Sequence, residues 1–224
     1  TRDAIFPANR HALYEEHGYS AAIRSGDLLF VSGQVGSRED GSPEPDFAAQ
    51  VRLADALGIE VWAAVVGGSM GGMHALEWGV GHPDRLDRLA ILAAPPVNTA
   101  DQIALNSVQL EAIRIDPRFQ DGEYYDAADG DGPHRGLALA RRMALLNYRS
   151  PTELNLRFQR TWQSGKSPLG LGGRFAVESY LDFHGNKFTR RFDANSYITL
   201  VEAMNSHDVG RDRGGVDDAL SRVT

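Results

Sequence analysis

The sequence predicts an α/β chain in which a short piece of parallel sheet is followed by many helices. Residues 61–66 form a nearly continuous apolar run of strand length, which suits a strand buried on both faces. A glycine-rich turn, a helical segment and a second apolar run at residues 89–94 follow in that order. This order implies a right-handed parallel crossover. From residue 99 to residue 204, almost every segment has helical periodicity.

The part of the chain before the apolar runs begins with β-structure. Residues 19–24 and 28–35 flank the turn signal Ser25-Gly26-Asp27 and therefore predict a β-hairpin. Residues 36–43 are polar and rich in turn formers, so we expect an exposed loop there.

Two helices are expected on either side of the first apolar run. The first covers residues 45–57, because Asp46 can cap its free N–H groups and Gly58 can end it. The second follows the glycine-rich turn and continues to Val80, where Gly81-His82-Pro83 closes it.

The remaining helices are expected to form a large insertion over the sheet. Their periodic segments are residues 103–115, 136–148, 152–162, 177–183, 195–204 and, near the end of the chain, 215–223. The predicted organisation is a hairpin and helix start (1–50) followed by a region (51–224) that comprises a core piece (51–98), a helical cap (99–210) and an end helix (211–224).

Composition excludes several classes of function. The chain has 224 residues, a formal net charge of −7 and 42% hydrophobic residues, which suits an ordinary core and argues against general affinity for nucleic acid or anionic membranes. It has no cysteine, so disulfides, thiolate nucleophiles and Cys-ligated metals are excluded, and no metal site is predicted. The longest apolar stretches are far shorter than the roughly 20 residues of a membrane span. Without a signal peptide, a cytoplasmic location is expected, and Thr1 in place of methionine suggests a processed or partial product.

The sharpest local signal is the sequence Gly67-Gly68-Ser69-Met70-Gly71, a G-x-S-x-G pattern between an apolar strand and a helix. In the α/β-hydrolase fold, such a turn projects the serine Oγ from the sheet, and small residues two before and two after it relieve backbone crowding. The backbone N–H of Met70 could then bind a tetrahedral oxyanion. The sequence therefore predicts Ser69 as a nucleophile.

Other interpretations of these glycines fail on particular residues. A dinucleotide fingerprint that begins at Gly67 would need glycine where Ser69 stands. A phosphate-binding P-loop needs Gly-Lys-Ser/Thr, but Gly72 is followed by Met73 and His74. The remaining alternative is that the glycines only permit a close strand-to-helix turn.

A serine nucleophile needs a histidine to accept its proton and an acid to orient that histidine. In this fold class the chain order is Ser, then Asp or Glu, then His. The histidines after Ser69 are His74, His82, His134, His184 and His207, and none is expected at the end of a sheet strand. The pair His207-Asp208 is the least unsuitable substitute. We expect the acid and the base to be absent, because the chain stops before the strands that would carry them.

Residues 65–78 closely resemble the corresponding turn of homoserine O-acetyltransferases, which belong to the α/β-hydrolase superfamily. Further segments that look like this family, in the same order, are residues 101–104, 109–114, 116–117, 122–125, 136–141, 177–181, 185–188, 191–197 and 205–210. The resemblance covers residues 51–224. The expected fold is therefore a partial α/β-hydrolase fold with a large helical cap.

This resemblance implies acyl transfer from acetyl-CoA or succinyl-CoA to homoserine, through an acyl group on Ser69, in methionine biosynthesis. No bound cofactor is implied. In this family an arginine and a tyrosine seven residues later bind the amino-acid substrate, and Arg141 and Tyr148 match them. Seven residues are close to two helical turns, so both side chains should lie on one stripe. A guanidinium pairs well with a carboxylate. Without the resemblance, the edge of an amphipathic helix would be the favoured interpretation of this pair.

Residues 1–54 instead resemble the N-terminal part of the Rid (YjgF-type) family of enamine/imine deaminases, through residues 26–34, 41–43 and 46–52. The substrate-binding arginine of that family lies in a part that this chain lacks. A fusion of two partial sequences is therefore expected, and the hairpin should be Rid-like.

The expected function is homoserine O-acyltransferase by ancestry, in a chain that is inactive by itself. The alternatives are a Rid-type deaminase fragment and a non-catalytic binding or assembly fragment. A two-strand piece of parallel sheet leaves apolar edges unpaired, so we expect poor solubility or homo-oligomers.

Overall fold

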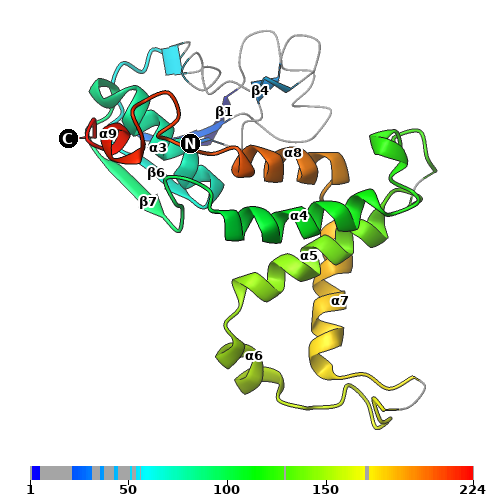
Figure 1. Ribbon diagram of the computed structural model, residues 1–224. Helices are drawn as coiled ribbons and strands as arrows, with labels where there is room; N and C mark the ends of the chain where they lie inside the picture. Colours follow the sequence, from blue (N-terminus) through cyan, green and yellow to red (C-terminus); the bar gives the residue numbers. More distant parts are fainter. Residues whose placement is uncertain are drawn as a thin grey trace. The chain divides into compact units, whose positions relative to one another are not determined.

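The computed structural model describes residues 2–5, 22–31, 36–37, 43–44, 51, 54–55, 57–128, 130–169 and 172–223 (Figure 1). The chain divides into two compact units, which are considered separately. The first unit comprises Thr1–Val97 and Asp208–Thr224, and the second comprises Asn98–His207. Among the described residues, no helix is long and apolar enough to cross a membrane.

A three-stranded antiparallel sheet lies near the N-terminus. It has the order β1-β2-β3, with β1 at Arg2–Ile5, β2 at Ala22–Ser25 and β3 at Leu28–Val31. The predicted hairpin is confirmed in the described residues, because β2 pairs with β3 from Ala22↔Val31 to Ser25↔Leu28. Strand β1 was not predicted.

Two short strands lie within or beside the segment that was expected to be a loop. Strands β4 (Gly36–Ser37) and β5 (Pro43–Glu44) pair antiparallel with each other. The predicted helix at residues 45–57 lies mostly outside the described residues. Its described end turns at Gly58, where φ is 67°, and the N–H of Ile59 donates to the carbonyl of Ala54 at 2.9 Å.

A strand, a helix and a parallel strand form the centre of the first unit. Strand β6 (Val65–Gly68) leads into α3 (Met70–Gly81), and the chain returns through the short helix η1 (Pro83–Arg85) to β7 (Leu89–Leu92). The two strands pair in parallel from Val65↔Leu89 to Gly68↔Leu92, which confirms the predicted parallel pair.

The first of these strands begins later than predicted. Residues 61–64 do not belong to β6, and Trp62 makes only an isolated parallel bridge to Leu86. The ladder instead begins where the N–H of Val65 donates to the carbonyl of Arg88 at 2.9 Å. The observed strand therefore lies closer to the two glycines at its end than the predicted strand does. Its bounds are determined by pairing with β7 and not by the length of the apolar run.

The expectation that this strand is buried on both faces is wrong. Val66 is 64% exposed and Leu92 is 58% exposed. Side chains alternate between the faces of a sheet, and exposure alternates along both strands in the same way. Leu89 and Ile91 lie on the face of the sheet that packs against α3. No described element covers the other face of these two strands.

The C-terminal segment returns to the first unit and packs on α3. Val209 and Ala219 form a small core with Leu76 and Val80 of α3. The end helix, α9 (Val216–Leu220), is shorter than the predicted 215–223. The ion pair between Arg213 Nη2 and Glu77 Oε2, at 2.8 Å, adds a partly buried polar tie between the segment and α3.

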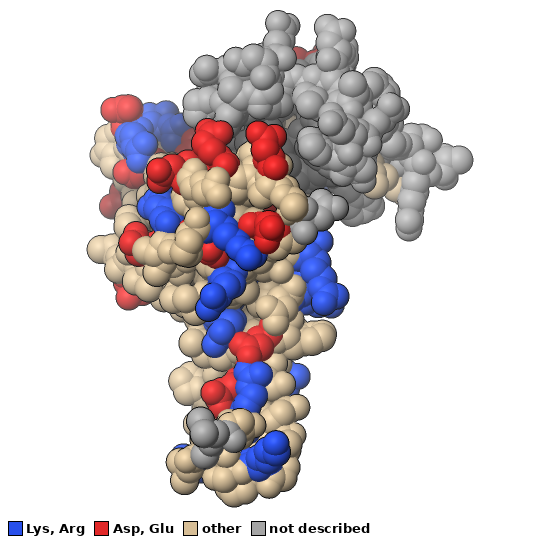
Figure 2. All heavy atoms as spheres, turned by 90° about the vertical axis from the view of Figure 1, so that its right-hand side faces the viewer, with Lys and Arg blue, Asp and Glu red and all other residues tan. Residues whose placement is uncertain are grey.

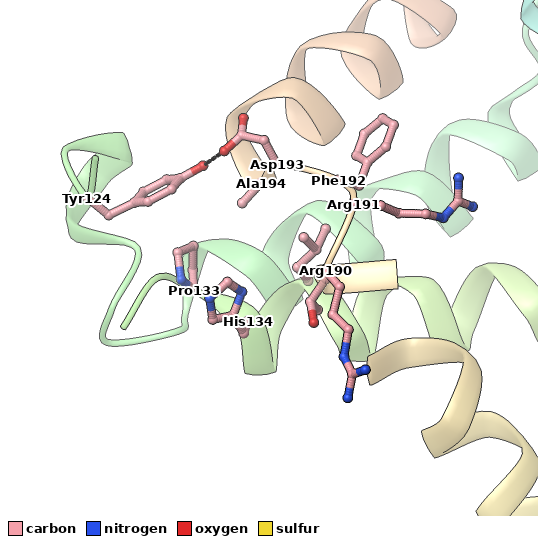
Figure 3. A pocket seen from close by; sticks show the side chains of 10 residues that line it. Tyr124, Pro133, His134, Arg190, Arg191, Phe192, Asp193 and Ala194 are labelled. Atoms are coloured by element: carbon pink, nitrogen blue, oxygen red, sulfur yellow. Dashed lines mark hydrogen bonds between the residues drawn. The ribbon is translucent and has the colours of Figure 1, made fainter. Parts of the chain in front are cut away.

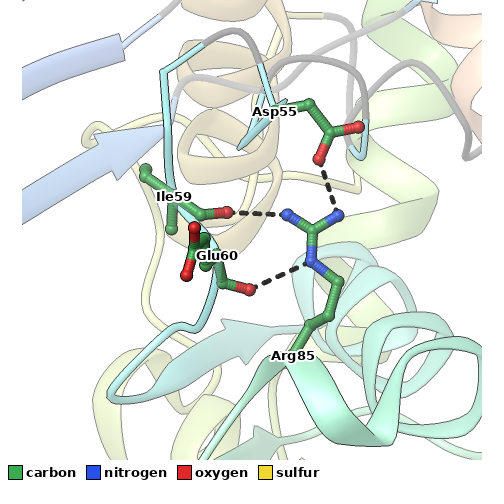
Figure 4. Close-up of polar contacts among 4 residues, drawn as sticks. All are labelled: Asp55, Ile59, Glu60 and Arg85. Atoms are coloured by element: carbon green, nitrogen blue, oxygen red, sulfur yellow. Dashed lines mark hydrogen bonds and ion pairs between the residues drawn. The ribbon is translucent and has the colours of Figure 1, made fainter.

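A second polar tie holds η1 against the chain that precedes β6 (Figure 4). The Arg85 guanidinium donates to Asp55 Oδ1 at 2.8 Å, to the Ile59 carbonyl at 2.6 Å and to the Glu60 carbonyl at 3.1 Å. Two of these acceptors are backbone carbonyls that lie outside the strands. The guanidinium thus supplies the hydrogen bonds that a neighbouring strand would otherwise provide. These contacts hold the chain before β6 against η1.

The second unit is helical, as predicted. Its elements are α4 (Ala100–Arg114), η2 (Gln120–Gly122), α5 (His134–Tyr148), α6 (Pro151–Phe158), α7 (Ala176–Thr189) and α8 (Ala194–Asn205). Helix α6 ends before the predicted residue 162, because Gln159 takes a φ of 48°. Helix α7 continues to Thr189 instead of ending at 183. Three of the helices begin with side-chain caps, from Thr99, Ser150 and Asp193.

Two glycines allow α5 to pack closely against both of its neighbours, α4 and α7. A Cβ at Gly136 would lie 2.5 Å from the carbonyl oxygen of Ala112, and one at Gly185 would lie 2.9 Å from that of Ala138. The buried Asp116 carboxylate also accepts from the N–H of Gly136 at 2.7 Å. Helix α5, which carries Arg141 and Tyr148, is thus held on two sides.

Candidate functional site

Ser69 occupies a strained bend between β6 and α3. Its φ is 54° and its ψ is −125°, the conformation of the first central residue of a type II′ turn, where glycine is favoured. Such a conformation costs a residue with a side chain on the order of 1–3 kcal/mol. The bend is anchored on both sides: the N–H of Ser69 donates to the Leu92 carbonyl at 2.9 Å, and its own carbonyl accepts from Gly72 at 2.8 Å.

The glycines around Ser69 are required for different reasons. A Cβ at Gly67 would lie 1.9 Å from the carbonyl oxygen of Gly71, and one at Gly72 would lie 2.6 Å from the Cβ of Ala94. At Gly71 a Cβ would meet nothing within 4 Å. The expected crowding is therefore real two residues before the serine. After the serine, it falls on Gly72 instead of Gly71.

The hydroxyl of Ser69 does not serve the helix that it precedes. A serine at this position commonly accepts a hydrogen bond from the first turn of the helix. Ser69 is exposed, makes no side-chain cap on α3, and its hydroxyl has no hydrogen-bond partner among the described residues. Among the described residues, the hydroxyl of Ser69 therefore makes no contact that stabilises the fold, although the residue is strained.

Helix α3 begins directly after Ser69, so its first backbone N–H groups belong to the residues that follow the serine. No described residue accepts a hydrogen bond from the N–H of Met70 or of Gly71. Such donors are left over at any helix N-terminus, and the helix dipole favours negative charge there. The arrangement can therefore stabilise an oxyanion that forms next to Ser69.

The described histidines do not form a hydrogen bond with Ser69. His74 lies on α3, and His82 ends that helix with its ring centroid 5.5 Å from that of Trp78. The other three belong to the second unit. In the pair suggested as a substitute, Asp208 is engaged locally, because its Oδ1 accepts from the N–H of Gly210 at 2.9 Å. His207 belongs to the second unit and Asp208 to the first.

Arg141 and Tyr148 lie together on one stripe of α5. The Arg141 Cζ is 5.6 Å from the ring centroid of Tyr148 and 4.9 Å from that of Phe188. Arg141 forms no ion pair with any described residue, and Tyr148 is 64% exposed. A guanidinium that is partly buried between aromatic rings and lacks a carboxylate can take one from a ligand.

Phe188 joins this stripe to the core of the second unit. Its ring stacks on Phe192 at 4.8 Å and meets Tyr197 edge-on at 5.9 Å. The Tyr197 hydroxyl donates to Gln109 Oε1 at 2.5 Å, and burial, as the largest cause, raises the pKa of Tyr197 to about 12. The ring of Phe188, which contacts the Arg141 guanidinium, is therefore held in place by buried contacts.

A cavity of about 380 Å³ lies elsewhere in the second unit and was not predicted (Figure 3). Its wall includes Tyr124 and Asp193, whose hydroxyl and carboxylate are hydrogen-bonded to each other. Burial and this hydrogen bond raise the pKa of Tyr124. Asp193 also caps α8 by accepting from the N–H of Ser196 at 2.8 Å. These contacts hold α8 in place, and only the Asp-Ala-Asn-Ser sequence of residues 193–196 hinted at them, as a helix start.

The chain is similar to known proteins over most of its length. The family described as the alpha/beta hydrolase fold matches residues 43–205. A homoserine O-acetyltransferase of Clavibacter michiganensis subsp. michiganensis (strain NCPPB 382) is 78% identical over 176 residues, which are 79% of this chain and 45% of that protein. That of Leifsonia xyli subsp. xyli (strain CTCB07) is 76% identical over 176 residues, which are 79% of this chain and 44% of that protein. The chain thus spans less than half the length of these relatives.

Solved structures show the same fold. The crystal structure of homoserine O-acetyltransferase from Bacillus anthracis matches with a TM-score of 0.71 at 24% identity, over 87% of this chain and 54% of that one. At this identity the likeness shows the fold alone. Among the described residues, no group of three or more His, Asp or Glu side chains is placed to hold a metal ion.

Proposed function

This chain belongs to the alpha/beta hydrolase fold family, and we propose that it is the nucleophile-and-cap part of a homoserine O-acyltransferase. The observation that carries the proposal is the state of Ser69, which is strained, exposed and not used as a helix cap. Residues held in such strained conformations cluster at active sites. The identity of 78% to a homoserine O-acetyltransferase supplies the substrate class.

In the proposed reaction, Ser69 Oγ attacks the carbonyl carbon of an acyl-CoA thioester. The N–H of Met70 stabilises the resulting oxyanion. The C–S bond then breaks, CoA leaves as its thiol, and the acyl group stays on Ser69 as an ester. Attack by the homoserine hydroxyl on that ester releases O-acylhomoserine and returns the proton to Ser69 Oγ. Each step needs a base for the attacking hydroxyl.

Arg141 and Tyr148 are proposed to bind homoserine. The guanidinium of Arg141 would pair with the α-carboxylate, and the hydroxyl of Tyr148 would add a hydrogen bond. The absence of an ion pair for Arg141 among the described residues supports this role, as does the contact of the two side chains. Acetyl and succinyl donors are both compatible with these residues.

We further propose that the 224-residue chain does not turn over by itself. In the described residues the hydroxyl of Ser69 has no histidine partner, and a serine without its base retains little activity. Incubation with acetyl-CoA and homoserine should give no O-acetylhomoserine above the level of a Ser69→Ala variant. Turnover that depends on Ser69 would contradict this part of the proposal.

A chimera tests the family function separately from the activity of the chain. Residues 51–224 would replace the matching segment of the Clavibacter michiganensis relative, which supplies the rest of the fold. The chimera should form O-acetylhomoserine, and Ser69→Ala should abolish the product. A folded chimera without activity, beside an active parent enzyme, would contradict the proposed function.

Several expectations remain predictions. These are the likeness of residues 1–54 to the Rid family, the fusion, the division into core piece, cap and end helix, the possible homo-oligomer and the cytoplasmic location. Hydrolysis of an imine substrate by the chain would favour the deaminase alternative. Binding of homoserine without any acyl transfer, in both chain and chimera, would favour the non-catalytic alternative.

A further inference from the structure

Positive charge is concentrated in one part of an otherwise acidic chain. Residues 133–192 contain 11 Lys and Arg residues and only three Asp and Glu residues, whereas the whole chain has 23 and 30. This basic segment comprises α5, α6, α7 and the turns that join them. Figure 2 shows basic side chains along this part of the surface, with a few acidic ones between them.

The three acidic residues of the basic segment are already engaged. Asp182 pairs with Arg142 at 3.0 Å and also with Arg174. Glu153 pairs with Arg149 at 3.1 Å, and Glu178 accepts from a backbone N–H at the start of α7. The cations without an ion pair among the described residues are Arg135, Arg141, Arg157, Arg160, Lys166, Lys187, Arg190 and Arg191. Local acids therefore do not neutralise the segment.

Several of these cations converge on His184 of α7. Burial lowers the pKa of His184, and so do the charges of Lys187, Arg141, Arg149 and Arg157, in that order. These four residues come from α5 and its C-terminal cap, from α6 and from α7. Cationic side chains from three helices thus act on the imidazole of His184.

Aromatic rings hold the cations in place. The Arg157 Cζ is 4.8 Å from the ring centroid of Tyr180, and the rings of Tyr180 and His184 are 4.6 Å apart. Lys187 Nζ is 6.0 Å from the ring centroid of Phe183, whose ring is 5.3 Å from that of His184. We call His184, Arg157, Lys187 and the two rings of Tyr180 and Phe183 the His184 surface. It combines fixed positive charge with aromatic faces.

We propose that the His184 surface binds the phosphate groups of the CoA thioester through residues other than Arg141, which is assigned to homoserine. This inference rests on the proposed function. One carboxylate on Arg141 would leave most of the positive charge unbalanced, whereas the diphosphate and 3′-phosphate of CoA carry several negative charges. Charge-assisted hydrogen bonds from guanidinium and ammonium groups suit phosphate oxygens, and the exposed ring of Phe183 can face the adenine.

Calorimetric titration of the chain with 3′,5′-ADP, which has phosphates and adenine but no thioester, tests the site. Binding should occur, should weaken as salt rises, and should weaken about tenfold or more in the double variant Arg157→Gln/Lys187→Gln. The matched control is Lys166→Gln/Arg190→Gln, which removes the same charge from the same segment but leaves the groups around His184. Its affinity should fall less than threefold, about the screened effect of distant charges.

The imidazole of His184 reports on the location of the ligand. In an NMR titration, bound phosphate should raise the pKa of His184, because negative charge offsets the surrounding cations. An unchanged pKa with bound ligand, or equal losses of affinity in the two double variants, would overturn the inference. Equal affinity for acetyl-CoA and acetyl-pantetheine, which lacks the phosphates, would also overturn it.

The two proposals can fail independently. Binding of 3′,5′-ADP does not require the hydroxyl of Ser69, so Ser69→Ala should bind it as the original chain does. If the chimera makes no product but the binding results hold, the acyltransferase proposal fails and the phosphate site stands. If the chimera is active but 3′,5′-ADP does not bind, only the phosphate site fails.

Discussion

The backbone N–H of Ser69 donates to the carbonyl oxygen of Leu92 at 2.9 Å, one step beyond the last paired residues of β6 and β7. The ladder therefore extends up to the serine itself. The chain then turns sharply, because Gly72 and Met73 donate to the Ser69 carbonyl at 2.8 and 3.1 Å. The neighbouring strand and the first turn of α3 together hold Ser69 in a conformation that it would not adopt alone.

Replacement of Ser69 should separate stability from chemistry. Ser69→Gly should raise the free energy of unfolding by about 1 kcal/mol relative to Ser69→Ala, because glycine adopts a φ of 54° without strain. Urea unfolding of the two variants measures this difference. Both variants should be inactive in the chimera. If Ser69→Ala proved the more stable of the two, the strain at this residue would be disproved.

The glycines on either side of the serine should respond differently to alanine. Gly67→Ala should destabilise the first unit by about 2–3 kcal/mol, since the new Cβ would overlap the Gly71 carbonyl oxygen. Gly71→Ala, the matched control, should be neutral or stabilising by up to about 1 kcal/mol, because space is open there and alanine favours a helix. Urea unfolding compares the two, and equal effects would refute the steric explanation.

The exposed face of the parallel pair should drive association of the chain. Val66→Thr/Leu92→Thr should reduce self-association and change stability by less than about 0.5 kcal/mol, because both residues are more than half exposed. Light scattering over a concentration series measures association. Val80→Thr, at a residue that is 1% exposed, should instead lose about 1–3 kcal/mol. Unchanged association in the double variant would show that another surface is responsible.

His184 should make the second unit sensitive to acid. Its pKa is lowered in the folded chain, first by burial and then by neighbouring cations, so the unfolded chain binds this proton more readily. Stability is therefore unaffected well above pH 6.5 and falls as the pH drops below about 6.5. His184→Gln should lose less stability between pH 7.5 and pH 5.5 than the original chain. Thermal unfolding at the two pH values, with His134→Gln as a control, measures the effect.

Arg141 should act on homoserine and not on the acyl donor. In the chimera, Arg141→Gln should raise the KM for homoserine about tenfold to 100-fold, the range expected for one charge-assisted hydrogen bond. Tyr148→Phe should have a smaller effect in the same direction. The KM for acetyl-CoA should stay within about threefold, because its phosphates are assigned to other cations. Equal increases for both substrates would place Arg141 elsewhere in the mechanism.

Several features followed from the sequence by itself because their signals are local. The hairpin around Gly26, the strand-turn-helix order at Ser69 and the end of α3 near Gly81 each depend on a few neighbouring residues. Helical periodicity likewise placed α4, α5 and α8 within a few residues of their observed bounds. The seven-residue spacing of Arg141 and Tyr148 was enough to place them on one stripe.

Only the tertiary structure decided features that depend on contacts between distant segments. Pairing with β7 determined where β6 begins, and the lack of a described neighbour left Val66 exposed although its run looked fully buried. The need for glycine at 72 depends on Ala94, and the cations around His184 come from three helices. Periodicity records which face of an element is apolar, but packing determines what lies against that face.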